Sequence, residues 1–324
     1  MTSSYPETAS ERDHWILDRR PSRNKLDPQR PYAFLIEKER AESGDIESVA
    51  TIFLTNRECP WRCLMCDLWK NTLTATVPPG SIPAQIDYAL NGLPDREAAN
   101  QIKLYNSGSF FDPKAIPVGD YEAIARRIAQ FERVVVECHP QLVNDSCLRF
   151  RDLLRGKLEV AMGLETVHPQ VLDKLNKRMT LDLFSRAAEF VRNNQIALRV
   201  FVLVKPPFLD ETEALLWAMR SIEFTFDCGA TVVSLIPTRL GNGALEKLED
   251  QGQFAPPKLA TLEKALAYGI NQQRGRVFAD LWDLQKFCDC PACFCARQDR
   301  LQYMNLHQIV PPEIRCSNCP RASS

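Results

Sequence analysis

Short apolar, β-branched runs alternate with longer segments of helical periodicity through most of this chain, and this alternation restricts its fold more than any other feature. The apolar runs lie at residues 48–55, 102–107, 133–138, 158–164, 198–204 and 231–237. They are nearly continuous, as expected for parallel strands that are covered on both faces. Helical patterns lie at 120–131, 182–195 and 211–229, and one more follows at 258–273. The alternation predicts an α/β fold of βα units in one parallel sheet, either open and doubly wound or a partial barrel.

The composition changes on both sides of these repeats. Residues 1–44 are expected to form an N-terminal segment that is polar and disordered to about residue 14 and basic after it. The repeats predict a core domain over residues 45–285. Residues 286–324 contain six cysteines and little periodicity. So short a segment can hardly build an apolar core of its own, which predicts a small Cys-rich, metal-binding C-terminal appendage.

The number of cysteines bears on both cofactors and cellular compartment. The chain has 12 cysteines, and nine of them fall in two clusters, at 59–66 and 288–319. No apolar run approaches the ~18 residues of a membrane span, and the N-terminal sequence lacks the apolar core of a signal peptide. We therefore expect a cytoplasmic protein with no membrane partner. Because the cytosol keeps thiols reduced, the clustered cysteines are expected to be metal ligands.

The first cluster lies in "TNRECPWRCLMCDLWKNT", where Cys59, Cys63 and Cys66 follow the first apolar run. In parallel βα folds, sites are built in the loops after the carboxyl ends of strands. A structural zinc site needs four protein ligands. Three thiolates can instead hold three irons of a [4Fe–4S] cubane and leave the fourth iron open. The alternatives are half of a zinc site and three cysteines that merely lie close together.

This C-x3-C-x2-C spacing after the first strand of a six-fold βα pattern resembles the radical S-adenosylmethionine (SAM) superfamily. The resemblance implies a partial (βα)6 barrel with a [4Fe–4S] cluster whose open iron binds the amino and carboxylate groups of SAM. Reductive cleavage of SAM then gives a 5′-deoxyadenosyl radical that abstracts hydrogen from a substrate. The resemblance also implies an electron donor such as ferredoxin or flavodoxin.

The resemblance further implies positions that contact SAM. The turn in "YNSGSFFDP" would bind the amino group through its backbone, although a simple turn is the alternative. Carboxylate and hydroxyl oxygens after the fourth strand would accept bonds from the ribose, and a later cation would meet the SAM carboxylate. Met65 replaces an aromatic residue that often precedes the third cysteine. Arg199, inside an apolar run, either lines the cavity or points out of the sheet at an edge. The candidates are Met65, Asn106, Ser107, Gly108, Ser109, Glu165, Thr166, Lys177 and Arg199.

The stretches 106–113, 163–180 and 236–257 are similar to radical SAM proteins close to the elongator catalytic subunit and to the radical SAM subunit of archaeosine synthase, a tRNA-modifying enzyme. This likeness implies a tRNA nucleotide as substrate. The other readings are a radical SAM enzyme acting on a small metabolite or peptide, and a non-catalytic metal-binding interaction module.

Docking to RNA would depend on local cations, because Lys plus Arg is 40, Asp plus Glu is 41, and the net charge is -1. The best candidates are the metal tail and the basic segment with Arg19, Arg20, Arg23, Lys25 and Arg30. That segment also contains Asp18 and Asp27, so a solvated tail is the alternative.

The second cluster contains two C-x2-C pairs, Cys290 with Cys293 and Cys316 with Cys319, separated by 22 residues. Two such pairs can supply the four thiolates of a structural zinc site. An auxiliary [4Fe–4S] cluster also takes four cysteine ligands and is the rival. Cys288 and Cys295 are left over, and they could flank the site or replace a ligand.

Overall fold

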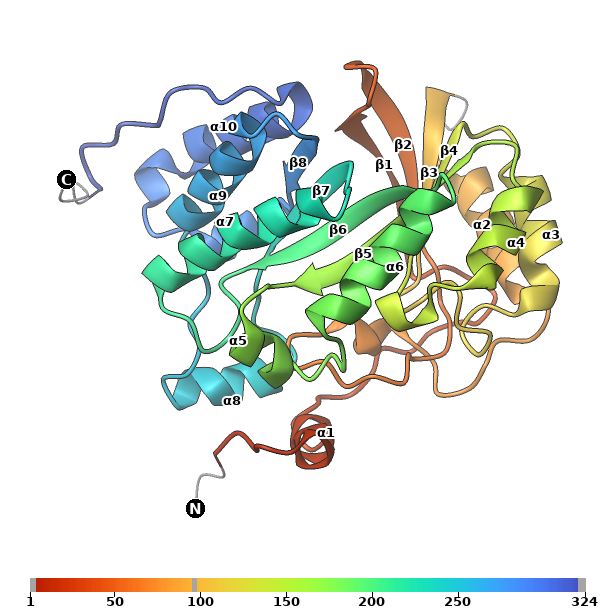
Figure 1. Ribbon diagram of the computed structural model, residues 1–324, viewed down its shortest axis with the longest axis horizontal. Coiled ribbons are helices and arrows are strands. Elements are labelled where there is room, and N and C mark those ends of the chain that lie inside the picture. The colour runs from red at the N-terminus through yellow and green to blue at the C-terminus, as the bar shows by residue number, and fades with distance from the viewer. Residues whose placement is uncertain (1–3, 95–97, 320–324) are drawn as a thin grey trace.

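A computed structural model describes residues 4–94 and 98–319 (Figure 1). Its strands form a single sheet in the order β1 to β8. The strands are β1 (Ala33–Arg40), β2 (Ile46–Phe53), β3 (Ala99–Tyr105), β4 (Arg133–Glu137), β5 (Lys157–Glu165), β6 (Ala197–Val204), β7 (Val232–Pro237) and β8 (Arg276–Ala279). The helices are α1 (Ala9–Leu17), α2 (Ser81–Gly92), α3 (Tyr121–Arg127), α4 (Asp145–Leu153), α5 (Pro169–Lys174), α6 (Leu181–Asn193), α7 (Glu211–Asp227), α8 (Ala244–Asp250), α9 (Leu259–Asn271) and α10 (Pro291–His307).

The predicted α/β fold, a partial barrel of parallel strands with a Cys-rich appendage, is confirmed. Strands β2 to β7 correspond to the six expected strands and pair in parallel, each with the next. The sheet is larger than expected at both ends, because β8 adds a parallel strand and β1 pairs with β2 in antiparallel register. None of the helices in the described ranges is long and apolar enough to cross a membrane.

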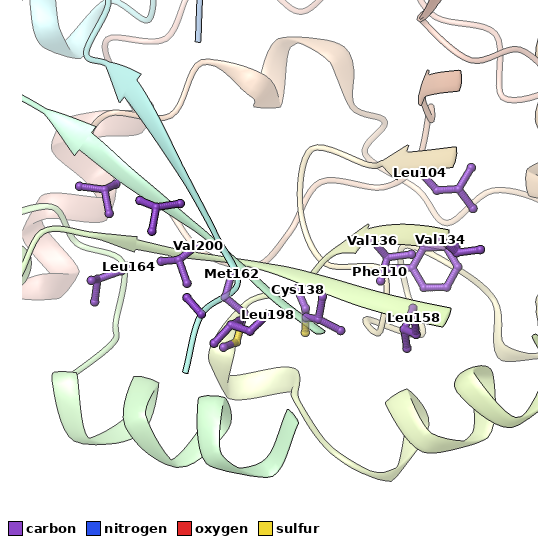
Figure 2. Packing of buried hydrophobic residues seen from close by; sticks show 14 of the residues in the cluster. Leu104, Phe110, Val134, Val136, Cys138, Leu158, Met162, Leu164, Leu198 and Val200 are labelled. Atoms are coloured by element: carbon purple, nitrogen blue, oxygen red, sulfur yellow. The ribbon is translucent and has the colours of Figure 1, made fainter. Parts of the chain in front are cut away.

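One face of the sheet carries the apolar core. Side chains at alternate positions of each strand pack against the surrounding helices, as Leu158, Met162 and Leu164 of β5 do (Figure 2). Glu159, which lies between Leu158 and Val160, belongs to the opposite, inner face because side chains alternate along a strand. Glu165 ends the strand after an irregularity in its pairing with β6. The inner face is therefore more polar than the nearly continuous apolar runs suggested.

Buried charges on the inner face form a closed network near the amino ends of the strands. The Arg199 guanidinium lies 2.6 Å from a carboxylate oxygen of Glu39 and 2.6 Å from one of Glu159. Lys103 Nζ lies 2.6 Å from the other oxygen of Glu39. Burial alone would raise the pKa of Glu39, but Arg199 and Lys103 outweigh it and hold this pKa well below its usual range. Mutual pairing is what allows these charges to be buried.

This network corrects the expectation for Arg199. It is the third residue of β6, whereas the other candidate SAM contacts follow the carboxyl ends of their strands. It is 2% exposed, so it does not point out of the sheet at an edge. Its guanidinium is paired with two carboxylates. Arg199 therefore has a structural role at the floor of the half-barrel, the end formed by the amino ends of the parallel strands.

The N-terminal segment also differs from the expectation, since residues 1–44 contain α1 and β1. The helix begins at a Thr8 cap that accepts a bond from the Glu11 amide. Its apolar residues Trp15 and Ile16 are buried in a cluster with Leu64 and residues of α8. A short helix with only a few apolar residues gives too little periodicity to be recognised from sequence.

The C-terminal tail is more regular than expected as well. Helix α10 packs Leu301 and Met304 into the main core. Gln308 and Asn305 exchange amide hydrogen bonds with the backbone of β8, at 2.7 to 2.9 Å. These side chains satisfy backbone groups of the last strand that no further strand pairs, and so protect the sheet edge. The division at residues 44 and 285 stays a prediction.

Replacing Arg199 with Leu should lower the free energy of unfolding by about 3–5 kcal/mol at neutral pH, because it leaves Glu39 and Glu159 buried with fewer partners. The loss should shrink as the pH falls, since without Arg199 the pKa of each carboxyl rises and protonation relieves the buried charge. Denaturant unfolding at several pH values measures both effects. Arg126→Leu, which breaks an exposed pair with Glu122, is the control and should stay within about 1 kcal/mol of wild type. Equal stability of the two variants would contradict this account.

Candidate functional site

The loop after β2 carries Cys59, Cys63 and Cys66, and all three are free thiols. Distant parts of the chain hold this loop through backbone contacts. The amide of Leu64 donates to the carbonyl of Leu175 at 2.9 Å, and the side chain of Asn242 donates to the carbonyl of Leu64 at 2.7 Å. The loop is therefore fixed by residues from the far half of the sheet.

Glu58, which directly precedes the first cysteine, anchors the loop electrostatically. Its carboxylate pairs with Arg20 at 2.7 Å, with Arg62 at 3.1 Å, and with Arg23 through its second oxygen. Burial would raise the pKa of Glu58, but hydrogen bonds from Arg20 and Arg23 lower it below its usual range. Arg20 also lies over the ring of Trp69, 4.6 Å from its centroid. One buried acid thus ties the N-terminal segment to the cysteine loop.

These contacts correct the expectation that the basic segment is free to dock RNA. Arg20 and Arg23 are engaged by Glu58, and Arg19 lies 3.9 Å from the ring centroid of Trp15 and donates to its carbonyl. The segment's remaining cations, Lys25 and Arg30, are exposed. The segment therefore supports the site, and three of its arginines are not available to phosphate.

The turn after β3 approaches the cysteine loop closely. A Cβ added at Gly108 would lie 3.3 Å from the Cβ of Cys59, so a larger residue would crowd the loop. Ser107 has a φ of 52°, a left-handed conformation that few residues adopt without support. The support comes from Glu137, whose carboxylate accepts a 2.8 Å hydrogen bond from the amide of Asn106 and further bonds from the next two amides.

The side chain of Asn106 is the strongest sign of a ligand site. Asn106 is fully buried, yet neither its amide nitrogen nor its amide oxygen has a hydrogen-bond partner among the described residues. Unpartnered buried polar groups are costly and rare in native structures. The amide offers one acceptor and two donors to a group bound beside the cysteines, which suits the amino and carboxylate groups of an amino acid.

Glu137 is a site residue that the sequence did not single out. Burial raises its pKa to about 7 in spite of the three amides that donate to it. It ends the strand "RVVVE", and a charged residue closing an apolar run at the carboxyl edge is the signal that could have found it.

Glu165 and Lys177, expected to contact different parts of SAM, form an ion pair with each other. A Cβ at Gly163 would lie 2.2 Å from atoms of both side chains, so this glycine makes room for the pair. Burial raises the pKa of the Cys63 thiol, and the positive charge of Lys177 is the largest influence that lowers it. The pair therefore lies close to the cysteines. Thr166 is buried and its hydroxyl accepts a bond from the His168 amide.

Of the other candidates, Ser109 is buried and bonds to the thiol of Cys138 at 3.5 Å. Met65 packs against an apolar cluster that includes Leu175 and Leu203. The structure thus brings the 106–109 turn, Glu165 and Lys177 to the cysteine loop, and it places Arg199 at the floor of the half-barrel.

His139 stacks on Trp61 of the cysteine loop, with ring centroids 3.7 Å apart and an interplanar angle of 10°. Its Nδ1 accepts a bond from the Gln141 amide, and Nε2 lies 3.1 Å from the carbonyl of Lys177. Burial and the neighbouring Lys177 lower its pKa to about 3. The neutral imidazole therefore supports the cysteine loop.

The four tail thiols converge on one point. The Sγ atoms of Cys290 and Cys316 lie 3.8 Å apart, those of Cys293 and Cys319 lie 3.6 Å apart, and all four lie within 4.8 Å of one another. Tetrahedral thiolates about 2.3 Å from one zinc ion are separated by about 3.8 Å. A cubane gives each thiolate its own iron, which needs a wider spacing. The arrangement fits a single tetrahedral ion, and the left-over Cys288 and Cys295 lie outside the group.

Comparison with known proteins relates the chain to others of similar sequence and fold. No family model matches it. An uncharacterized protein of Methanocaldococcus jannaschii is 24% identical over 91% of this chain and 87% of its own length. Archaeosine synthase subunit beta of Methanosarcina acetivorans is 28% identical over 67% of this chain, which spans 65% of that subunit. The structure of Elp3 from Methanocaldococcus infernus, at 14% identity, has a TM-score of 0.52 over 79% of this chain and 62% of that one, a likeness of fold.

Replacing Glu58 with Gln should loosen the cysteine loop, because three arginines lose the charge that they share. We expect a loss of about 3 kcal/mol in the free energy of unfolding and faster tryptic cleavage at Arg57 and Arg62 in metal-free protein. Mass spectrometry of limited digests gives the cleavage rates. Glu42→Gln, at an exposed acid that also pairs with an arginine, should leave the loop protected. Unchanged cleavage in the Glu58 variant would show that the backbone contacts alone hold the loop.

Proposed function

We propose that this chain is a radical SAM enzyme, which cleaves SAM reductively at a [4Fe–4S] cluster held by Cys59, Cys63 and Cys66. The observation that carries the proposal is the unpartnered, buried amide of Asn106 in a turn that reaches the cysteine loop at Gly108. Three free thiols fit a cubane with one open iron. The amide can exchange hydrogen bonds with the amino and carboxylate groups of an amino acid ligand. The bound cluster would supply one electron to the sulfonium of SAM, whose C–S bond then breaks.

The residues of the chain have separate roles in this proposal. Asn106 and the backbone of the 106–109 turn orient the methionine part of SAM, and Glu137 holds the turn by accepting its amides. Lys177 would meet the SAM carboxylate by charge attraction, and Glu165 would accept bonds from the ribose hydroxyls. SAM would separate the Glu165–Lys177 pair or bind across it. Met65 would pack near the adenine.

Replacing any one of Cys59, Cys63 and Cys66 with Ala should abolish 5′-deoxyadenosine formation, since each thiolate holds one iron. The fold should survive, because the three cysteines lie in a loop. Chromatography of anaerobic reactions with dithionite measures the product, and circular dichroism checks the fold. Cys295→Ala, at an exposed cysteine outside both ligand sets, is the control and should keep wild-type activity. A triplet variant that still forms 5′-deoxyadenosine would refute the assignment.

We further propose that the substrate is a nucleotide of tRNA. Support comes from the likeness to archaeosine synthase subunit beta and from the Elp3-like fold. A small metabolite or peptide is the second candidate, favoured by the scarcity of free cations in the N-terminal segment. Hydrogen abstraction needs the target held close to the deoxyadenosyl carbon and shielded from water.

Nucleoside analysis of tRNA from a strain that lacks the protein tests the substrate. We expect one modified nucleoside to be lost or replaced by its precursor, and to return with the wild-type gene but not with Cys63→Ala. Gel-shift titrations at two ionic strengths should show binding of tRNA that weakens with salt, because phosphate contacts release counterions. An unchanged nucleoside profile, with no binding at either salt, would favour the small-substrate reading.

For the tail we propose one structural zinc ion on Cys290, Cys293, Cys316 and Cys319, as the short sulfur–sulfur distances favour. Metal analysis should give about one zinc per chain beside the iron. Cys316→Ala should remove that zinc and expose residues 286–324 to proteolysis, while Cys288→Ala should do neither. About eight irons per chain without zinc would replace this reading with an auxiliary cluster.

A further inference from the structure

A cavity of about 560 Å³ opens on the outer side of the cysteine loop, and Cys59 is part of its wall. The wall also includes Trp61 and has four cationic side chains against two acidic ones. The cavity therefore places a net positive surface beside one cysteine of the triplet. Neither the fold nor the binding of SAM requires such a surface.

Two of the four cations are free to act on a partner. Arg23 and Arg62 are held by Glu58. The side chains of Arg57 and Lys114 make no hydrogen bond or ion pair with other described residues, and Lys114 is exposed. Both lie at the rim on segments that follow neighbouring strands, β2 and β3. Free cations beside a redox site favour electrostatic steering of an acidic protein.

The other sides of the loop are occupied. Asn106, Glu165 and Lys177 form the inner side, where the proposed function places SAM. Residues of α1 and α8 cover Leu64 in a shared apolar cluster. The cavity beside Cys59 is therefore the side of the loop from which we expect a protein donor to approach.

We propose that this cavity, rimmed by Arg57 and Lys114, is the docking surface for an acidic one-electron donor protein. The inference rests on the proposed function. The donor's reduced flavin or iron–sulfur centre loses one electron, the cluster gains it, and no bond forms or breaks in this step. RNA is the alternative occupant, and the test distinguishes it from the donor protein.

The test compares Arg57→Glu/Lys114→Glu with the matched control Arg155→Glu/Lys157→Glu, whose exposed cations lie at the amino end of β5, the opposite edge of the sheet. The probe is a reduced acidic flavodoxin, and calorimetry measures its binding to the reconstituted holoprotein at low and high salt. We expect the rim variant to lose about tenfold or more in affinity at low salt, and the control to match wild type. In the rim variant, stopped-flow bleaching of the cluster by flavodoxin should slow by a similar factor, whereas the rate of bleaching by dithionite should not change.

Flavodoxin binding by the rim variant with wild-type affinity would overturn the proposal. A rim variant whose reduction by dithionite slows as much as its reduction by flavodoxin would also overturn it, because the two cations would then support the cysteine loop itself. Loss of tRNA binding with intact flavodoxin binding would also overturn it and assign the surface to RNA. The milder Arg57→Gln/Lys114→Gln should show a smaller loss of affinity in the same direction. Failure of the proposed function is distinguishable, because wild type would then form no 5′-deoxyadenosine with dithionite, whatever its affinity for flavodoxin.

Discussion

The candidate site depends on the ion pairs that the carboxylate of Glu58 forms. The loop that follows it has a single short turn of 3-10 helix, Leu68–Asn71, and otherwise lacks regular structure. Such a loop holds three thiols in fixed relative positions only if contacts from other parts of the chain restrain it. Arg20 and Arg23 reach Glu58 from the N-terminal segment, and Arg62 reaches it from the loop itself. Removing one member of a partly buried charge group leaves the others without compensation, so the group acts as one unit.

The same rule, that buried charges must be paired, divides the inner face of the half-barrel into two zones. At the floor, the charges of Arg199 and Lys103 are matched by those of Glu39 and Glu159. At the carboxyl edge, the amide of Asn106 has no partner and a lone acid–base pair lies beside the cysteines. Polar groups that await a ligand are thus concentrated at the edge where the βα loops converge.

Much of this arrangement could be predicted from the sequence, and the failures have a common cause. Local periodicity located the six central strands, and local spacing located the triplet and the tail pairs, whose four thiols the structure brings together. The errors concern partners that are distant in sequence. Arg199 looked available because Glu39 lies 160 residues away. Arg20 and Arg23 looked like RNA contacts because two strands, β1 and β2, separate them from Glu58 in sequence. Glu137 was missed because its charge at the end of an apolar run is the only local sign of it, while the amides that it accepts lie in another loop.

The account predicts that SAM binds beside the cysteine triplet through Asn106. Electron paramagnetic resonance of the reduced, reconstituted protein tests this claim most directly, because coordination of SAM changes the environment of one iron. We expect SAM to alter the spectrum of the wild-type protein, and a much higher SAM concentration to be needed for the same change in Asn106→Ala. A wild-type spectrum that is identical with and without saturating SAM would contradict the account.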